Sequence, residues 1–131
     1  MTELLTAILA RFNAAEGATL KALVTGMFLY KAPQKQAVPY ITVTYPAGSV
    51  DSVMANHDHD LFNITFSIWD TASTPAQVLL ISDALCELYD NVILTLTTRT
   101  VVYANRVAGN LVEDPDKGWA KHVQYEYRVS N

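Results

Sequence analysis

Residues 62–69, FNITFSIW, decide the fold of this chain, because apolar and polar side chains alternate there with the period of a β-strand. Successive side chains of a strand point to opposite faces, so the apolar set shares one face. The sequence therefore predicts a strand with one face in the core and the other in water. The apolar set is Phe62, Ile64, Phe66 and Ile68, and the polar set is Asn63, Thr65 and Ser67.

A helix start follows this strand. Thr74 can cap the helix, Pro75 suits the first helical position, and Gln77 completes a capping box three residues after Thr74. An apolar stripe at helical spacing continues from there, which predicts an amphipathic helix. The stripe consists of Val78, Ile81, Leu85, Leu88 and Tyr89.

A second amphipathic helix is expected at residues 3–15, where apolar residues recur at helical spacing before Gly17. A short helical turn at residues 20–25 is stopped by Gly26. The other segments have strand patterns, and residues 47–60 form a polar loop or an extended hairpin arm. Strands are expected near residues 27–30, at 40–45, 92–96 and 100–107, and in a hairpin of 111–113 and 119–129 around the DPDKG turn at 114–118.

This order of helices and strands predicts one α+β domain spanning residues 1–131, with a mostly antiparallel sheet and two main helices packed on one face. The length of 131 residues suffices for a single core. The single cysteine, Cys86, excludes an internal disulfide framework. Since no apolar run reaches about 18 residues and Glu3 stands where a signal peptide has basic residues, we expect a soluble protein made in the cytoplasm and no contact with a membrane.

Charge is distributed unevenly along the chain. Residues 49–90 contain seven acidic side chains and no lysine or arginine, whereas the segments before and after are slightly basic. Binding to a nucleic-acid duplex needs a clustered basic face, so this gap argues against it. Only 17% of the residues are charged, against about 25% in average soluble domains. The polarity predicts either an acidic solvated face or an interface whose partner side is basic.

Residues 56–60, NHDHD, are the strongest candidate for a metal site. His57 and His59, two apart on an extended segment, would point to the same side, and His122 could supply a third ligand from another strand. No further Cys or His spacing motif accompanies them. A solvated arm that leads into the strand explains them better, and a metal-binding module or enzyme using His57 and His59 stays as the alternative.

Two other candidate sites have structural explanations. The DPDKG segment resembles the start of a calcium loop, but its glycine comes one residue early and Tyr125 stands where a bidentate Glu is needed. Cys86 has no basic neighbour in sequence that would activate it, which favours a small buried hydrophobe. We therefore expect no enzyme activity, no bound metal and no cofactor.

Five segments resemble the tail-completion or tail-terminator family of long-tailed phages, prophages and gene transfer agents. They are GMFLYKAPQKQAVPYITVTY at 26–45, FNITFSIWD at 62–70, AQVLLISDALCELYD at 76–90, LTLTTRTVVY at 94–103 and LVEDPDKGWAKHVQYEYRV at 111–129. The resemblance implies a homo-hexameric ring that caps the tail tube, ends its polymerisation and meets the head connector. It also implies assembly in the host cytoplasm, a final location in the virion tail, and a channel through which DNA passes without specific binding. A neck protein of the head–tail connector is the alternative within this class.

The long arm and the hairpin turn are the expected contacts with neighbouring rings, because long loops often carry function. The acidic segment could line the channel, where negative charge would keep passing DNA from sticking. The candidate interface residues are Ser49, Asp51, Met54, His57, Asp58 and Asp60 in the arm, and Asp116, Lys117 and Trp119 in the hairpin.

Overall fold

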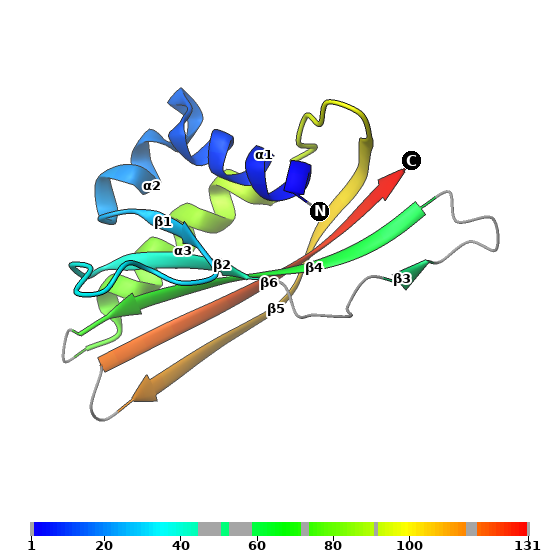
Figure 1. Ribbon diagram of the computed structural model, residues 1–131. Helices are drawn as coiled ribbons and strands as arrows, with labels where there is room; N and C mark the ends of the chain where they lie inside the picture. Colours follow the sequence, from blue (N-terminus) through cyan, green and yellow to red (C-terminus); the bar gives the residue numbers. More distant parts are fainter. Residues whose placement is uncertain are drawn as a thin grey trace.

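A computed structural model describes residues 2–44, 51–52, 59–71, 74–90, 92–114 and 118–130. One sheet carries helices over one of its sides (Figure 1), so the expected α+β class is confirmed. The chain order is α1 (Thr2–Asn13), a 3-10 turn (Ala15–Gly17), α2 (Ala18–Leu23), β1 (Met27–Leu29), β2 (Tyr40–Thr44), β3 (Asp51–Ser52), β4 (His59–Asp70), α3 (Ala76–Tyr89), β5 (Thr100–Asp114) and β6 (Gly118–Ser130).

The spatial order of the strands is β1-β2-β4-β6-β5, and β3 adds a short pairing to β4. The β1–β2 pair is parallel, and the other pairs are antiparallel. The strand that the FNITFSIW pattern predicts is β4, which pairs with β2 on one side and β6 on the other. This order leaves β5 at one edge of the described sheet and the three-residue β1 at the other.

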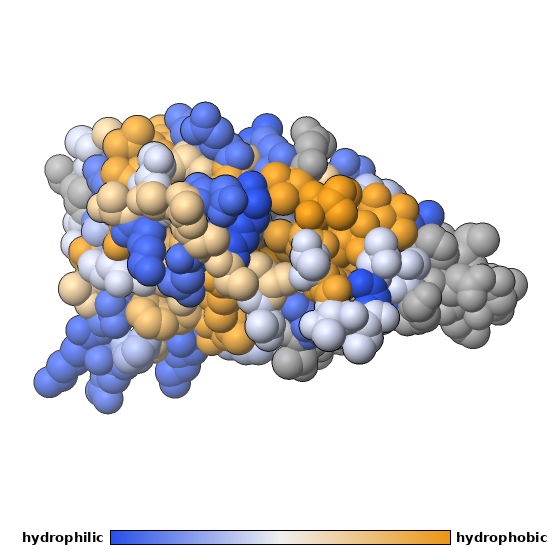
Figure 2. All heavy atoms as spheres, turned by 90° about the horizontal axis from the view of Figure 1, so that it is seen from above, coloured by the Kyte–Doolittle hydropathy of each residue, from blue (hydrophilic) through white to orange (hydrophobic). Residues whose placement is uncertain are grey.

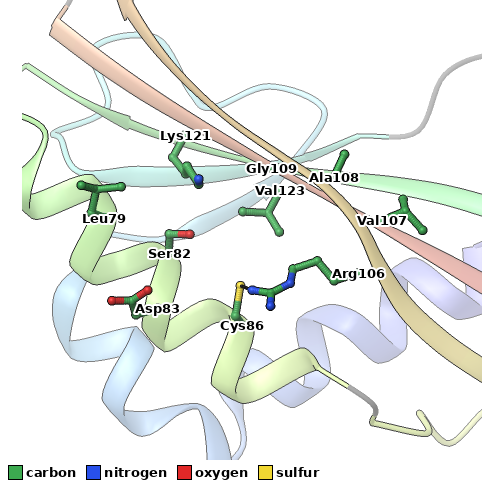
Figure 3. Close-up of a pocket in the computed structure, with 10 residues that line it drawn as sticks. All are labelled: Leu79, Ser82, Asp83, Cys86, Arg106, Val107, Ala108, Gly109, Lys121 and Val123. Carbon is green, nitrogen blue, oxygen red and sulfur yellow. Dashed lines mark hydrogen bonds between the residues drawn. The ribbon is translucent and has the colours of Figure 1, made fainter.

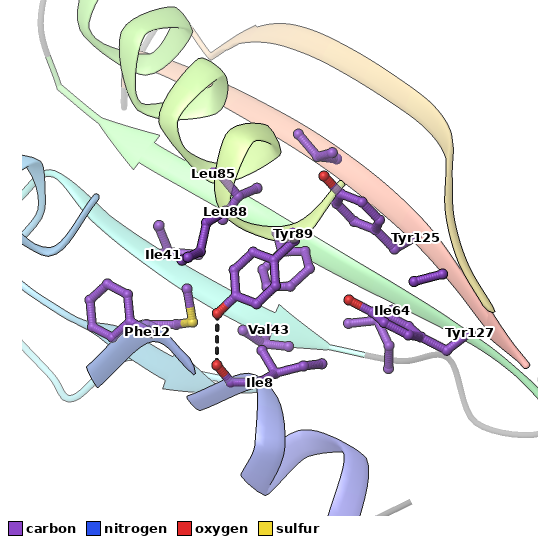
Figure 4. Packing of buried hydrophobic residues seen from close by; sticks show 14 of the residues in the cluster. Ile8, Phe12, Ile41, Val43, Ile64, Leu85, Leu88, Tyr89, Tyr125 and Tyr127 are labelled. Carbon is purple, nitrogen blue, oxygen red and sulfur yellow. Dashed lines mark hydrogen bonds between the residues drawn. The ribbon is translucent and has the colours of Figure 1, made fainter. Parts of the chain in front are cut away.

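The core lies between the helices and one face of the sheet (Figure 4). Every apolar residue of the β4 alternation is at most 3% exposed, which confirms the buried face. Phe66 stacks on Tyr89 of α3 at 4.9 Å between ring centroids and meets Tyr125 of β6 edge to face at 5.6 Å. Aromatic pairs of this kind contribute about 0.5–1.5 kcal/mol beyond their buried area, so they join α3 firmly to the two central strands.

The strand expected at residues 92–96 does not form. Its alternation is real, because Leu94 is only 6% exposed and Val92 and Leu96 pack partly against the core. These side chains pack against the core cluster and the helices instead of pairing with a neighbouring strand. The segment instead runs beside α1, where Leu94 and Ala7 line the same shallow pocket.

The expected strand at 100–107 and the arm at 111–113 are a single strand, β5. Gly109 and Asn110 suggest a break, but both stay in register with β6, opposite Val123 and His122. Irregularities after Val101 and Arg106 absorb the extra residues. An edge strand tolerates such bulges, because only one of its sides must keep a regular ladder.

The capping box expected at Thr74 is also wrong. Pro75 is the N-cap of α3, Ala76 is the first helical residue, and no side-chain hydrogen bond caps the helix. The Pro75 carbonyl oxygen accepts the first helical hydrogen bond from the Leu79 N–H at 3.0 Å. Because the helix starts one residue later than expected, Gln77 lies outside the third helical position that a capping box requires.

Candidate functional site

Six of the expected interface residues lie outside the described part of the chain: Ser49, Met54, His57, Asp58, Asp116 and Lys117. The backbone of Asp51 pairs with Leu61, and Ser52 pairs with Asp60, so β3 adds a short antiparallel pairing to β4. Trp119 is half-buried at the start of β6, where it packs against the core cluster. A contact of these residues with neighbouring rings stays a prediction.

The proposed third metal ligand, His122, lies far from His59. In the antiparallel ladder, His59 of β4 is opposite Ser130, whereas His122 is opposite Ser67, eight residues further along β4. At about 3.3 Å per residue, the two histidines are roughly 26 Å apart. In the described ranges, no group of three His, Cys, Asp or Glu residues could hold a metal ion. The alternative in which His122 completes a metal site with His59 is therefore wrong.

His122 has a structural setting of its own. Its Nδ1 lies 2.8 Å from the Ser67 Oγ, and its ring meets Trp69 edge to face at 5.6 Å. Burial lowers the pKa of His122, because a charged imidazolium would lose hydration there. The neutral ring fits the half-buried outer face of the sheet.

Cys86 has a basic neighbour that the sequence did not reveal. Arg106, twenty residues later in β5, donates from Nη1 to the Cys86 Sγ at 2.8 Å, and its Nη2 lies 3.6 Å from the Asp90 Oδ2. The Tyr125 hydroxyl donates to the other Asp90 oxygen at 2.6 Å. Burial raises the pKa of Tyr125, so its phenol stays protonated and keeps donating. These contacts tie the end of α3 to β5 and β6.

Large apolar side chains reach the surface in two regions. In the described part of the chain, six of the nine exposed ones lie on α3 or β5, and two, Leu29 and Tyr30, lie at the opposite edge beside β1. Figure 2 looks down on the side of the molecule that carries the helices and shows a broad apolar area on that side. Contiguous apolar surface on a soluble domain usually marks a contact with another macromolecule. The six residues are Leu79, Leu80, Val102, Val107, Leu111 and Val112.

A groove of about 400 Å³ separates α3 from β5 (Figure 3). Helix α3 packs mainly on β4 and β6, and the hydrogen bond from Arg106 to Cys86 connects it to β5. Leu79 and Cys86 form the helix wall, and Val107 and Gly109 lie on the strand side. A side chain at Gly109 would meet only Lys121 and backbone at ordinary contact distances.

A second hollow of about 440 Å³ lies on the other face of the sheet, under the loop that joins β1 to β2. Tyr30, Tyr40 and Trp69 line it together with Lys31 and Lys35, and we name it the aromatic hollow. The Trp69 Nε1 donates to the Thr42 Oγ1 at 3.2 Å. Because that indole N–H is already satisfied, the floor of the hollow can take an apolar group without leaving this donor unpaired.

No protein-family description matches this chain, and no curated protein matches it in sequence. Solved structures match its fold. This chain is similar in fold to a virion protein. A chain in the virion of a native gene transfer agent particle aligns with a TM-score of 0.81 and 18% identity, over 99% of this chain and 96% of that one. The bacteriophage SPP1 gp17 protein aligns with a TM-score of 0.62 and 19% identity, over 99% of this chain and 89% of that one.

At these identities the likeness establishes the fold. None of the helices in the described residues is long and apolar enough to cross a membrane. The described surface carries apolar and charged areas that suit contact with other protein chains.

Proposed function

We propose that this chain is a structural protein of a phage-type tail, which forms a ring at the head-proximal end of the tail tube. The ring ends polymerisation of the tube and joins the tail to the head. The observation that carries the proposal is the fold, which matches a gene transfer agent virion chain over almost the whole length of both chains. The resemblance of the sequence segments to the tail-terminator family supports the same role.

The surface of the chain supports assembly with further copies. Strand β5 has 15 residues and lies at the edge of the described sheet, so it spans roughly 50 Å with one side of its backbone ladder open. Four of its large apolar residues are exposed. A long apolar edge is costly for a solitary chain, because it attracts other strands. Packing against a neighbouring copy in a closed ring, which we propose to be a hexamer, removes that cost.

The charge of the chain fits a channel for DNA. No lysine or arginine occurs between Gln36 and Thr98, so nearly half of the sequence offers no lysine or arginine to the phosphate backbone. A ring that presents this segment to its channel would let DNA pass without holding it. The proposed partners are therefore the tail tube protein, the head connector and other copies of this chain, and the proposed location is the virion tail.

The proposal is tested by deleting the gene in a strain that produces the particles and examining them by electron microscopy. Loss of a terminator leaves overlong tubes without heads, and the wild-type gene on a plasmid restores joined particles. Tails of normal length beside unjoined heads would instead indicate the neck position. Normal particles after the deletion would refute both roles.

A further inference from the structure

We infer that neighbouring copies in the ring meet head to tail, with the exposed face of α3 of one copy seated in the aromatic hollow of the next. This inference rests on the proposed function, since it names the partner as a second copy of this chain. It uses only surfaces that the described residues form.

The first surface is a ridge on α3, formed by Leu79, Leu80, Asp83 and Glu87. Leu79 is 38% exposed and Leu80 is 51% exposed, and both acidic side chains are exposed. Asp83 and Glu87 are four residues apart and therefore lie on one face of the helix. Among the described residues, neither forms an ion pair or a side-chain hydrogen bond. Like charges at this spacing repel, so the ridge favours a cationic partner.

The second surface is the aromatic hollow, whose character is opposite to that of the ridge. It is concave, its three aromatic rings offer apolar contact, and its two lysines, Lys31 and Lys35, are exposed. Leucine side chains suit the aromatic lining, while the lysines can pair with carboxylates. Leu80 and Glu87 are seven residues apart, or about 10.5 Å along the helix axis, so one helix face can present apolar and acidic groups together. The two surfaces are thus complementary in hydrophobicity and charge.

The backbone of the β1–β2 loop supports a binding role. Tyr30 and Lys35 both have φ of 63°, in the left-handed region that costs a residue with a Cβ about 1–2 kcal/mol. Hydrogen bonds hold the loop there: the Tyr30 N–H donates to the Val43 oxygen at 2.8 Å, and the Thr25 hydroxyl donates to the Ala37 oxygen at 2.6 Å. Strain of this kind at a surface loop is typical of places that clamp a ligand or a partner.

The two surfaces lie on opposite faces of the sheet. Thr42 and Trp69, which line the hollow, alternate with the core residues Ile41 and Ile68, whereas α3 covers the core face. A chain therefore cannot fill its own hollow with its own ridge. A contact between two different surfaces is heterologous, and copies joined in this way form a ring when the rotation closes.

The test reverses the charges in a strain that lacks the chromosomal gene. Variant A carries Asp83→Lys and Glu87→Lys, and variant B carries Lys31→Glu and Lys35→Glu. We expect each to lower the yield of joined particles at least about tenfold, because like charges meet across the interface. A fourfold variant with all these changes should restore the yield, since every charge pair is again opposite. Lys21→Glu, an exposed lysine outside the hollow, is the matched control and should leave the yield unchanged.

Circular dichroism of each purified variant confirms that it folds, since only exposed charges change. Normal yields from variants A and B, or no rescue by the fourfold variant, would overturn the contact. The deletion strain separates this failure from failure of the proposed function. If the deletion leaves tails unjoined but the variants are active, only the contact is wrong; if the deletion has no effect, the function itself is wrong.

Discussion

The hydroxyl of Tyr89, at the end of α3, donates a 2.7 Å hydrogen bond to the carbonyl oxygen of Ile8 in α1, 81 residues earlier in the chain (Figure 4). The side chain of Tyr89 is fully buried between the two helices and the sheet. Burial raises the pKa of Tyr89, so the phenol stays protonated and remains a donor. This bond links the two long helices that cover the sheet.

Replacing Tyr89 by Phe should therefore lower the free energy of unfolding by about 1 kcal/mol, the usual net value of a buried hydrogen bond. Urea denaturation measures the change. Tyr127→Phe is the matched control, because the Tyr127 hydroxyl is buried and has no hydrogen-bond partner among the described residues. Its removal should leave stability unchanged or raise it. A larger loss for Tyr127→Phe than for Tyr89→Phe would contradict this assignment.

Gly118 should not tolerate a side chain. Its φ is +97°, and a Cβ there would clash with the Asp70 carbonyl oxygen. We expect Gly118→Ala to cost about 2 kcal/mol or more, from backbone strain and the clash with backbone atoms. Gly109→Ala is the comparison, since its Cβ would meet nothing closer than 3.5 Å. Equal thermal stability of the two variants would show that Gly118 is not constrained in this way.

Glu3 should make stability depend on pH in the acid range. Its two carboxylate oxygens accept 2.7 Å hydrogen bonds from the Thr98 hydroxyl and N–H, and these bonds lower the pKa of Glu3 below its ordinary value of 4.5. The folded state therefore favours the charged form, and its stabilising effect is present above about pH 4.5 and lost as pH falls through the lowered pKa. The stability gap between wild type and Glu3→Gln should shrink from pH 6 to pH 3. A gap that is constant with pH would contradict the prediction.

The burial of His122 should make the stability of the fold depend on pH in a second, higher range. Burial lowers its pKa below the ordinary value of 6.5, so the unfolded chain binds a proton more readily than the folded one. The contribution of the neutral ring is present above about pH 6.5 and is lost as pH falls through the lowered pKa. Wild type should lose stability between pH 7 and pH 5 more steeply than His122→Gln. His57 and His59 are present in both proteins, so the difference reports on His122 alone.

The head-to-tail contact also gives a test of whether the ring contains an even or an odd number of copies. Variants A and B repel copies of themselves but attract each other, so a mixture can close only by strict alternation. An even ring such as a hexamer permits alternation, whereas a ring of seven does not. Co-expression of both variants should therefore restore joined particles. Rescue by the fourfold variant without rescue by the mixture would indicate an odd ring.

Local patterns predicted the buried faces well. The period-two alternation in β4 and the helical spacing of apolar residues in α1 and α3 identify side chains that are buried in the core. These signals are local, because the geometry of one strand or helix fixes which of its own residues share a face. The hairpin between β5 and β6 was also expected, since its turn residues stand between two strand patterns.

The sequence patterns did not predict which strands, helices and side chains contact one another in the fold. Residues 92–96 alternate like a strand but pack against the core cluster instead, and the register of β4 and β6 places His59 far from His122. Arg106 and Cys86 meet across elements twenty residues apart, which no spacing motif signals. The arm residues selected as contacts lie mostly outside the described ranges.

The sequence by itself determined that this chain builds an α+β domain, which side chains enter its core, and that its middle third is acidic. Only the tertiary structure decided that an acidic, leucine-bearing face of α3 and a lysine-lined aromatic hollow lie on opposite faces of one sheet. The physical reason is that burial follows from the local repeat of each element, whereas the meeting of distant surfaces depends on strand order and register, which the whole chain sets together.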